Sequence, residues 1–161
     1  MSALKFRAVE ASDCGQLVLL LKELADVTGL GGKFEATSDQ LELALAHQPP
    51  LFHGLIAEVS GQALGVCLYY PQFSTWRGEA GVYVLDLIVR EHARGRSIGR
   101  KLLGAVCRDA FEKWQANYMS LDVDHLNQDG HAFYRRLGFV EDLSNKNLRL
   151  YGPPFQKAAG R

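Results

Sequence analysis

The chain has 161 residues, of which 47% are hydrophobic and 22% are charged, the size and composition of one globular domain with its own core. Eighteen Lys and Arg residues balance eighteen Asp and Glu residues, which excludes the strongly basic surface typical of proteins that bind nucleic acid or an anionic membrane. No apolar run approaches the roughly 20 residues of a membrane helix, and the first residues lack the apolar core of a signal peptide. We therefore expect a single domain over residues 1–161.

The first third of the chain predicts a short strand and two helices. Residues 6–8 can form the strand, and the N-cap residues at 12–13 begin a helix that carries four leucines on one face: Leu17, Leu20, Leu21 and Leu24. Thr37 and Gln40 form a capping box at the start of a second, shorter helix, which the prolines at 49–50 end.

The middle of the chain predicts extended structure. Residues 52–59 and 63–70 flank the turn residues 60–62 and form an antiparallel hairpin. Residues 83–89 are almost continuously apolar, which is typical of a central strand covered on both faces, and only Asp86 interrupts them.

A long amphipathic helix and several short elements follow. The helix has apolar residues four apart, Ile98, Leu102, Val106 and Ala110, flanked by Leu103, Cys107 and Phe111. Residues 118–123 form a strand, and Phe133, Tyr134 and Leu137 lie on a short helix that Gly138 can end in a left-handed conformation. We expect the last strands at Phe139 and at 148–151, before the Gly-Pro-Pro sequence.

The cysteines indicate a reducing compartment. Cys14, Cys67 and Cys107 form an odd set without a C-x-x-C pair, which does not fit a disulfide framework. We expect all three to act as small core residues and the protein to be cytoplasmic.

The segment between the apolar strand and the long helix has the character of an anion site. Residues 94–100 (R-G-R-S-I-G-R) open the helix, so its free N–H groups and the helix dipole point toward this turn. The small residues allow a pyrophosphate to approach the main chain, and three arginines add positive charge. The alternative is an ordinary glycine-rich turn with solvated arginines.

Residues 95–99 also match G-x-S-x-G, the nucleophile elbow of serine hydrolases, with Asp and His residues following in the order those enzymes use. An elbow needs its serine directly after the strand, whereas residues 90–94 intervene here. A chain of 161 residues is also short for the hydrolase sheet, so we regard this alternative as the weaker one.

Two longer segments resemble a known family. Residues 84–103, and residues 127–139 with their F-Y-x-x-L-G-F run, resemble the two central motifs of the GNAT N-acetyltransferase superfamily. Residues 23–25 (E-L-A) and 73–76 (F-S-T-W), followed by Tyr83 and Asp86, further resemble its spermidine/spermine N-acetyltransferase-like (diamine acetyltransferase) branch. The resemblance implies an α/β fold with a central mixed, mostly antiparallel twisted sheet of six to seven strands and about four flanking helices.

The resemblance also implies that the chain binds acetyl-CoA. The family signature R/Q-x-x-G-x-G/A falls on Arg94, Ser97 and Gly99, and Ser97, in place of the usual glycine, would be strained if its φ were positive. The whole turn would hold the pyrophosphate: Arg94, Gly95, Arg96, Ser97, Ile98, Gly99 and Arg100. The main chain of Leu87, Ile88 and Val89 would bind the pantetheine arm, Asn127 would reach the cofactor, and Tyr134 would lie beside its sulfur.

Acyl transfer to an amine needs an unprotonated nucleophile, stabilisation of the oxyanion and a proton for the departing thiolate. Tyr134 suits the last role, because a phenol with a pKa near 10 stays protonated at neutral pH. Without the resemblance, Tyr134 would be interpreted as a core residue beside Phe133. Main-chain N–H groups near Leu87 and Ile88 would stabilise the oxyanion.

The general base is not assigned by the sequence. In the polyamine branch it is a glutamate, and Leu85 stands at that position. Asp86 points to the opposite strand face unless a bulge re-aims it, and it could instead cap backbone groups beside the cleft. His125 and water are the other candidates. His47, His53 and His92 do not have the spacing of metal ligands. We therefore expect no metal site.

The predicted acceptor is a primary amine of a small molecule other than a polyamine. Acidic positions of the polyamine branch are occupied here by Val27 and Thr28 and by residues 145–147 (N-K-N), so a multiply charged cation would find few partners. A protein N-terminus or lysine is an alternative acceptor. The branch commonly forms dimers, which implies a homodimer. A different class, a non-catalytic acyl-CoA-binding or regulatory module, is favoured by Leu85.

Overall fold

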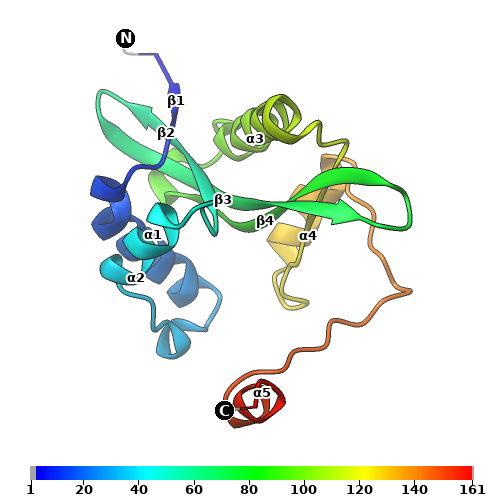
Figure 1. Cartoon of the computed structure of the whole chain (residues 1–161). Coiled ribbons are helices and arrows are strands. Elements are labelled where there is room, and N and C mark those ends of the chain that lie inside the picture. Colours follow the sequence, from blue (N-terminus) through cyan, green and yellow to red (C-terminus); the bar gives the residue numbers. More distant parts are fainter. Residues whose placement is uncertain (1–2, 161) are drawn as a thin grey trace. The chain divides into compact units, whose positions relative to one another are not determined.

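The computed structural model describes residues 3–160 (Figure 1). The chain divides into two compact units, Met1–Asn127 and Gln128–Arg161. The first unit contains the sheet, whose strands are β1 (Lys5–Ala8), β2 (His53–Val59), β3 (Gln62–Ser74), β4 (Glu79–Val89) and β5 (Tyr118–Leu121). Their order in the sheet follows their order in the chain. Three pairings are antiparallel and β4 pairs with β5 in parallel, so the predicted mixed, mostly antiparallel sheet is confirmed.

The described residues form five strands rather than the predicted six to seven. Phe139 and residues 148–151 have no regular structure, and the described part of the second unit, residues 128–160, contains helices but no strand. A strand needs a neighbouring edge that satisfies its N–H and C=O groups, and within this unit there is no other strand to offer one. Gly152 precedes a terminal helix, with prolines in its first turn, instead of closing a sheet.

The α-helices are α1 (Cys14–Val27), α2 (Ser38–Ala46), α3 (Ile98–Trp114), α4 (Gln128–Arg136) and α5 (Pro153–Ala158). Three short 3₁₀ turns lie at Ala11–Asp13, Gly31–Lys33 and Glu91–Ala93. In the first unit, α3 covers one face of the sheet and α1 and α2 lie on the other (Figure 1). None of the helices in the described part of the chain is long and apolar enough to cross a membrane.

The predicted apolar stripes form the core. Leu17, Leu20 and Leu21 of α1 pack in one cluster with Val66 and Leu68 of β3. The four-residue repeat of α3 is buried at every position: Ile98, Leu102, Val106 and Ala110. Both stripes follow from the 3.6-residue period, which brings side chains three and four apart to one side of a helix.

The cysteine prediction is correct for two of three residues. Cys14 and Cys67 are fully buried, whereas Cys107 is exposed. Cys107 follows Val106 on α3, so it lies about 100° around the helix from the buried stripe. All three thiols are free.

Two extended elements run further than predicted. The hairpin of β2 and β3 is confirmed, but β3 continues through Pro71 to Ser74. Beyond Tyr69 it pairs with β4 alone, so the N–H that proline lacks is tolerated in a stretch with one open edge. β4 likewise begins at Glu79 rather than at Tyr83.

Helix starts show one confirmed cap and one correction. Thr37 and Gln40 exchange hydrogen bonds between side chain and backbone at 3.0 and 3.3 Å, as the capping box requires. Asp13 is the N-cap residue of α1, but its side chain makes no cap hydrogen bond. Its carboxylate instead accepts two hydrogen bonds from Arg7, at 2.8 and 2.9 Å, and one from the backbone N–H of Glu10 at 2.8 Å.

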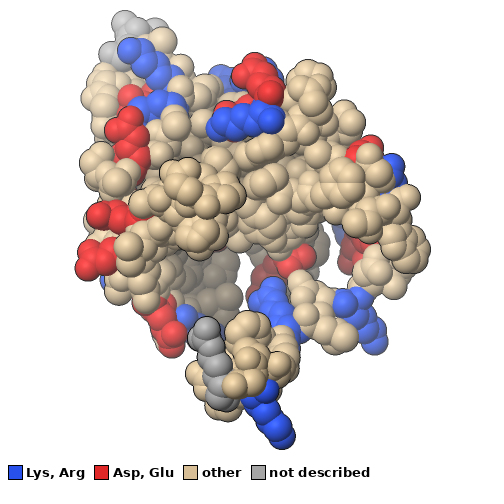
Figure 2. Space-filling model, viewed as in Figure 1, with Lys and Arg blue, Asp and Glu red and all other residues tan. Residues whose placement is uncertain are grey.

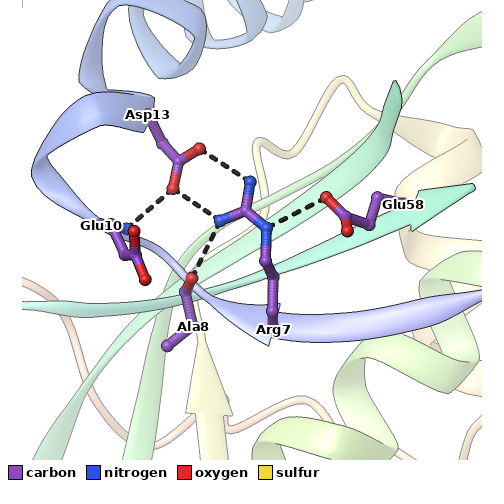
Figure 3. A network of polar contacts seen from close by, with 5 residues as sticks. All are labelled: Arg7, Ala8, Glu10, Asp13 and Glu58. Atoms are coloured by element: carbon purple, nitrogen blue, oxygen red, sulfur yellow. Dashed lines mark hydrogen bonds and ion pairs between the residues drawn. The ribbon is translucent and has the colours of Figure 1, made fainter. Parts of the chain in front are cut away.

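Arg7 is the centre of this network (Figure 3). In addition to Asp13, its Nε donates to Glu58 Oε2 at 3.0 Å, so one guanidinium joins β1, the turn before α1, and β2. The Asp13 side chain is only 9% exposed. The hydrogen bonds from Arg7 hold the pKa of Asp13 below its usual value.

Asp13→Asn should therefore destabilise the protein by about 1–3 kcal/mol at pH 7, because a partly buried guanidinium loses its charged partner. A lowered pKa contributes stability that is present above the unfolded-state pKa and is lost as the pH falls through the folded-state pKa. The gap between variant and wild type should thus narrow as the pH falls below about 4, the ordinary pKa of an unfolded-state aspartate. Urea melts at pH 7 and pH 3 measure it, and an equal loss at both pH values would contradict the charge argument.

Candidate active site

β4 has one edge that is only half paired. β5 pairs with it from Gly81 to Val84, and from Leu85 to Val89 only β3 pairs with it. The three positions that the sequence predicted for main-chain contacts, Leu87, Ile88 and Val89, all lie on this open stretch. An extended ligand can therefore hydrogen-bond to β4 here as a further strand would.

A turn with unsatisfied amides follows the open edge. Gly95 and Ser97 have positive φ values of 75° and 58°, and Ser97 is the N-cap of α3. The first amide of this helix start to find a backbone acceptor is that of Lys101, which donates to Ser97 O at 3.0 Å. The amides of residues 97–100 precede it, as expected for the first turn of a helix, and this end of the helix dipole favours an anion.

Ser97 has the positive φ that the sequence analysis named as the condition for backbone strain. Its φ and ψ of 58° and 19° are left-handed, a conformation that costs a residue with a Cβ about 1–2 kcal/mol. Glycine, the usual residue of the signature, adopts it freely. Such strain persists where the surrounding structure imposes it, most often at functional sites.

Positive charge surrounds this turn. Arg94, Arg96 and Arg100 are exposed, and the Nε of Arg94 donates to Val89 O at 3.1 Å. That hydrogen bond joins the turn to the open end of β4, so the structure brings these two predicted parts of the site together. Elsewhere acidic and basic side chains are interspersed, as Figure 2 shows for one face, so this turn is a local feature of a neutral protein.

Two predicted site residues lie at and beyond the boundary of the units. Asn127 ends the first unit, where its N–H donates to Asp124 O at 2.9 Å. Tyr134 is half-buried on α4 in the second unit, with its ring 5.1 Å from that of Phe133 and 5.3 Å from that of Phe139, both edge to face. Gly138 has a φ of 94° beyond the helix end, so the predicted left-handed stop is confirmed.

The candidate bases have different surroundings. Leu85 is 44% exposed, so β4 is not covered on both faces as predicted. Asp86 is half-buried, its side chain forms no hydrogen bond or ion pair with any described residue, and burial raises its pKa. The expected capping role of Asp86 therefore has no contact to support it. His125 is 90% exposed, with Nδ1 3.9 Å from Asp124 Oδ1.

The nucleophile elbow does not fit. Ser97 lies eight residues beyond the end of β4, with a 3₁₀ turn between them, rather than directly after the strand. Among the described residues, no histidine hydrogen-bonds to its hydroxyl. No three His, Cys, Asp or Glu side chains gather in metal-binding geometry in the described part of the chain.

β4 contains the β-bulge that the sequence analysis left open as the condition for re-aiming Asp86. Leu68 pairs with Asp86 and Tyr69 with Val84, which leaves Leu85 as the extra residue. The only signal in the sequence was the carboxylate within the apolar run 83–89, and this signal does not show which face the carboxylate occupies. The bulge lies where the pairing of β4 with β5 ends, beside a candidate active site, as is common for bulges.

Comparison with known proteins agrees with this geometry. The model of the Acetyltransferase (GNAT) family matches residues 20–139. The thialysine N-epsilon-acetyltransferase of Bos taurus is 28% identical over 173 residues, covering the whole of both chains. The spermidine/spermine N(1)-acetyltransferase-like protein 1 of Homo sapiens is 29% identical over 158 residues, which cover 94% of this chain and 22% of that protein.

Solved structures share the fold. An integron cassette protein from the mobile metagenome of V. cholerae superimposes with a TM-score of 0.78 at 24% identity, over 100% of this chain and 99% of that one. The ribosomal-protein-alanine N-acetyltransferase of Brucella melitensis biovar Abortus 2308 gives a TM-score of 0.72 at 21% identity, over 92% and 100%. The predicted α/β fold class is thereby confirmed, with a smaller number of strands.

Proposed function

The chain belongs to the acetyltransferase (GNAT) family, and on this premise we propose that it transfers an acetyl group from acetyl-CoA to a primary amine of a small molecule. The resemblance of residues 84–103 and 127–139 is confirmed by the match. The observation that carries the proposal is the junction of the open β4 edge with the strained, arginine-rich turn at the start of α3.

The residues of this junction fit acetyl-CoA. The amides of residues 97–100 and the guanidinium groups of Arg94, Arg96 and Arg100 suit a pyrophosphate, which needs hydrogen-bond donors and positive charge. The main chain of Leu87, Ile88 and Val89 suits the amides of a pantetheine arm. Asn127 would complete the cofactor contacts. Bound acetyl-CoA would supply an activated thioester carbonyl.

We assign the acid to Tyr134 and the reaction to direct attack in a ternary complex. A phenol stays protonated at neutral pH and can give its proton to a departing thiolate. Within the second unit, the ring of Tyr134 packs edge to face against the rings of Phe133 and Phe139. Main-chain N–H groups of β4 near Leu87 and Ile88 would stabilise the oxyanion.

The positions that are acidic in the polyamine branch hold neutral or basic residues here, at Val27, Thr28 and residues 145–147. At the end of α1, Val27 is 69% exposed and apolar. Asp142 uses its carboxylate in a local turn, where it accepts hydrogen bonds from the N–H and hydroxyl of Ser144 and from Asn145. The Bos taurus relative is named for thialysine, an amino acid with one side-chain amine, and we propose an acceptor of this charge class.

Acetyl-CoA should raise the melting temperature of the protein. A ligand that binds only the folded state stabilises it by about 2.7 kcal/mol at 100 times its Kd, which for a chain of this size is roughly 5–10 °C. S-acetylpantetheine, which has the thioester but no pyrophosphate, should give a much smaller shift, because it does not reach the turn at residues 94–100. Differential scanning fluorimetry measures both, and no shift at millimolar acetyl-CoA would refute the proposal.

Catalysis is tested by initial rates of free thiol release with a panel of amines: thialysine, L-lysine, spermidine and a peptide with a free N-terminal amine. Thiol release with thialysine or L-lysine in preference to spermidine supports the proposed acceptor class. Binding of acetyl-CoA without turnover on any amine would instead favour the non-catalytic acyl-CoA module that Leu85 suggests.

We further propose that residues 1–161 act as one acetyltransferase domain, because the family match runs through the boundary between the two compact units. A cytoplasmic location is proposed from the three free cysteines. A homodimer is proposed from the resemblance to the diamine acetyltransferase branch. Light scattering of the purified chain tests the dimer.

A further inference from the structure

α1 covers only part of one sheet face, and Asp86 lies between the covered part and the part that α1 does not cover. On β3, Val66 and Leu68 pack in the core cluster beneath the leucines of α1, whereas Tyr70, two residues on from Leu68 on the same face, is only half-buried. Residues paired across an antiparallel ladder share a face. Asp86 pairs with Leu68 and Tyr83 pairs with Tyr70, so both β4 residues lie on this face.

The bulge at Leu85 places Asp86 there. Tyr83 and Asp86 are three positions apart, and in a regular strand an odd separation puts two side chains on opposite faces. The register shift between Leu68 and Tyr69 inserts Leu85 as an extra residue and brings both side chains to the same face. Without the bulge, Asp86 would share the opposite face with the side chains beneath α3.

The surroundings of Asp86 on this face are aromatic and neutral. The rings of Tyr70 and Tyr83 stack with centroids 5.0 Å apart and an interplanar angle of 26°. Further along the face, Ser120 Oγ donates to Gln72 Oε1 at 2.6 Å. The other acidic residue of β4, Glu79, forms an ion pair with Arg77 at 2.8 Å. The carboxylate of Asp86 is thus the unpaired acidic group of β4 within the described residues.

The elements packed against β4 give Asp86 no opposite charge. β3 contributes the titratable groups Tyr70 and, from the opposite face, Cys67, whose pKa is raised chiefly by burial and also by the charge of Asp86. In the central and C-terminal turns of α1, the charged residues Lys22, Glu23 and Asp26 are exposed. α3 lies on the opposite face of the sheet from Asp86. Burial alone raises the pKa of Asp86. A half-buried carboxylate without a partner costs stability, and groups of this kind gather at functional sites.

We propose that Asp86 is the general base of the acetyl transfer and receives a proton from the ammonium group of the acceptor on the open half of this face. The inference rests on the function proposed above. It takes the role that the family gives to a glutamate at the position of Leu85 and moves it to the next residue, which the bulge turns toward Tyr83.

The proton count closes with the residues already assigned. One ammonium proton passes to the Asp86 carboxylate, and the freed nitrogen lone pair forms the C–N bond to the thioester carbonyl carbon. The C–S bond breaks and the sulfur takes the proton of the Tyr134 hydroxyl. The amide nitrogen keeps one of its three original hydrogens, because a second returns to the Tyr134 oxygen, and Asp86 releases its proton to solvent.

The test compares wild type and Asp86→Asn with acetyl-CoA and thialysine or L-lysine between pH 5.5 and 10. We expect kcat/KM to fall about 100-fold at pH 7, the contribution of a positioned base, and to recover partly at pH 10, where solution supplies free amine. Asp86→Glu should retain part of the activity. The thermal shift by acetyl-CoA should be unchanged in each variant. Asp39→Asn, the same change at an exposed position of α2, is the matched control.

Stability provides a readout that needs no acceptor. A carboxyl group with a raised folded-state pKa contributes its stability at acid pH and loses that contribution as the pH rises through the folded-state pKa. Asp86→Asn should therefore raise the melting temperature at pH 8, and the gain should shrink toward pH 4. A carboxylate that capped backbone groups would do the opposite, since its loss would lower the melting temperature at pH 8.

The possible results distinguish the assignment of Asp86 as general base from the proposed acetyltransferase function. Wild-type kcat/KM and pH dependence in Asp86→Asn, or a lower melting temperature at pH 8, would overturn the base assignment and leave the proposed function intact. A wild type that binds acetyl-CoA but acetylates no amine overturns the base assignment as well. A wild type that neither binds acetyl-CoA nor releases thiol refutes the proposed function, and the base assignment with it.

Discussion

Tyr134→Phe should lower the turnover number by roughly 10² or more, the usual contribution of a positioned general acid. The phenylalanine ring keeps the edge-to-face contacts with Phe133 and Phe139, so the substitution removes only the hydroxyl. Stability should change by no more than about 1 kcal/mol, the net value of one hydrogen bond. Initial rates under conditions where chemistry limits turnover, with a parallel thermal melt, measure both quantities.

The matched control is Tyr151→Phe, which removes a hydroxyl from a side chain that is 77% exposed in the same unit. This variant should keep wild-type turnover. The affinity for acetyl-CoA should change far less than turnover in Tyr134→Phe, because the acid acts in the transition state. A Tyr134→Phe enzyme with wild-type turnover would return Tyr134 to a packing role and leave the acid unassigned.

Gly99→Val should weaken acetyl-CoA binding at least tenfold, which corresponds to about 1.4 kcal/mol. Gly99 is the second residue of α3, and the turn before it contains the strained Ser97 and the exposed arginines. A branched side chain at this position pushes a pyrophosphate away from the free amides. Isothermal titration with acetyl-CoA measures the change in Kd.

Gly104 offers a control on the same helix. A Cβ there would meet only the side chain of Arg108, at 3.7 Å, so Gly104→Val places the same side chain on α3 without reaching the turn. Its Kd should match that of wild type. Because Gly99 is buried, Gly99→Ala is the milder second variant and keeps the test decisive if the valine lowers stability. Wild-type affinity in both Gly99 variants would refute the phosphate-binding role of the turn.

Local chemistry explains why much of the fold was predictable. The leucines of α1, the four-residue repeat of α3 and the Thr37–Gln40 capping box each involve residues at most four positions apart along a helix. Their spacing can therefore be recognised without knowledge of any distant segment. The turn at residues 94–100 could be predicted for the same reason, since a helix start exposes its own amides.

Strand pairing could not be predicted from the sequence, because the register of a strand depends on which sheet edge it pairs with. Residues 148–151 have the composition of a strand, yet no strand within their unit pairs with them. Asp13 was expected to cap α1, but its carboxylate binds Arg7, which β1 brings to it, and the N–H of Glu10 in the preceding 3₁₀ turn. A bidentate charged partner satisfies a buried carboxylate better than one amide does.

The helices with their apolar faces, the hairpin, and the glycine- and arginine-rich turn that marks the family follow from the order of the amino acids alone. The three-dimensional structure is needed to show that β4 separates from β5 after Val84 and that Leu85 forms a bulge. These two features open the edge at Leu87–Val89 and place Asp86 on its face of the sheet. The physical reason is the two-residue period of a strand: one inserted residue reverses every side chain beyond it, and only the partner strand shows where the insertion lies.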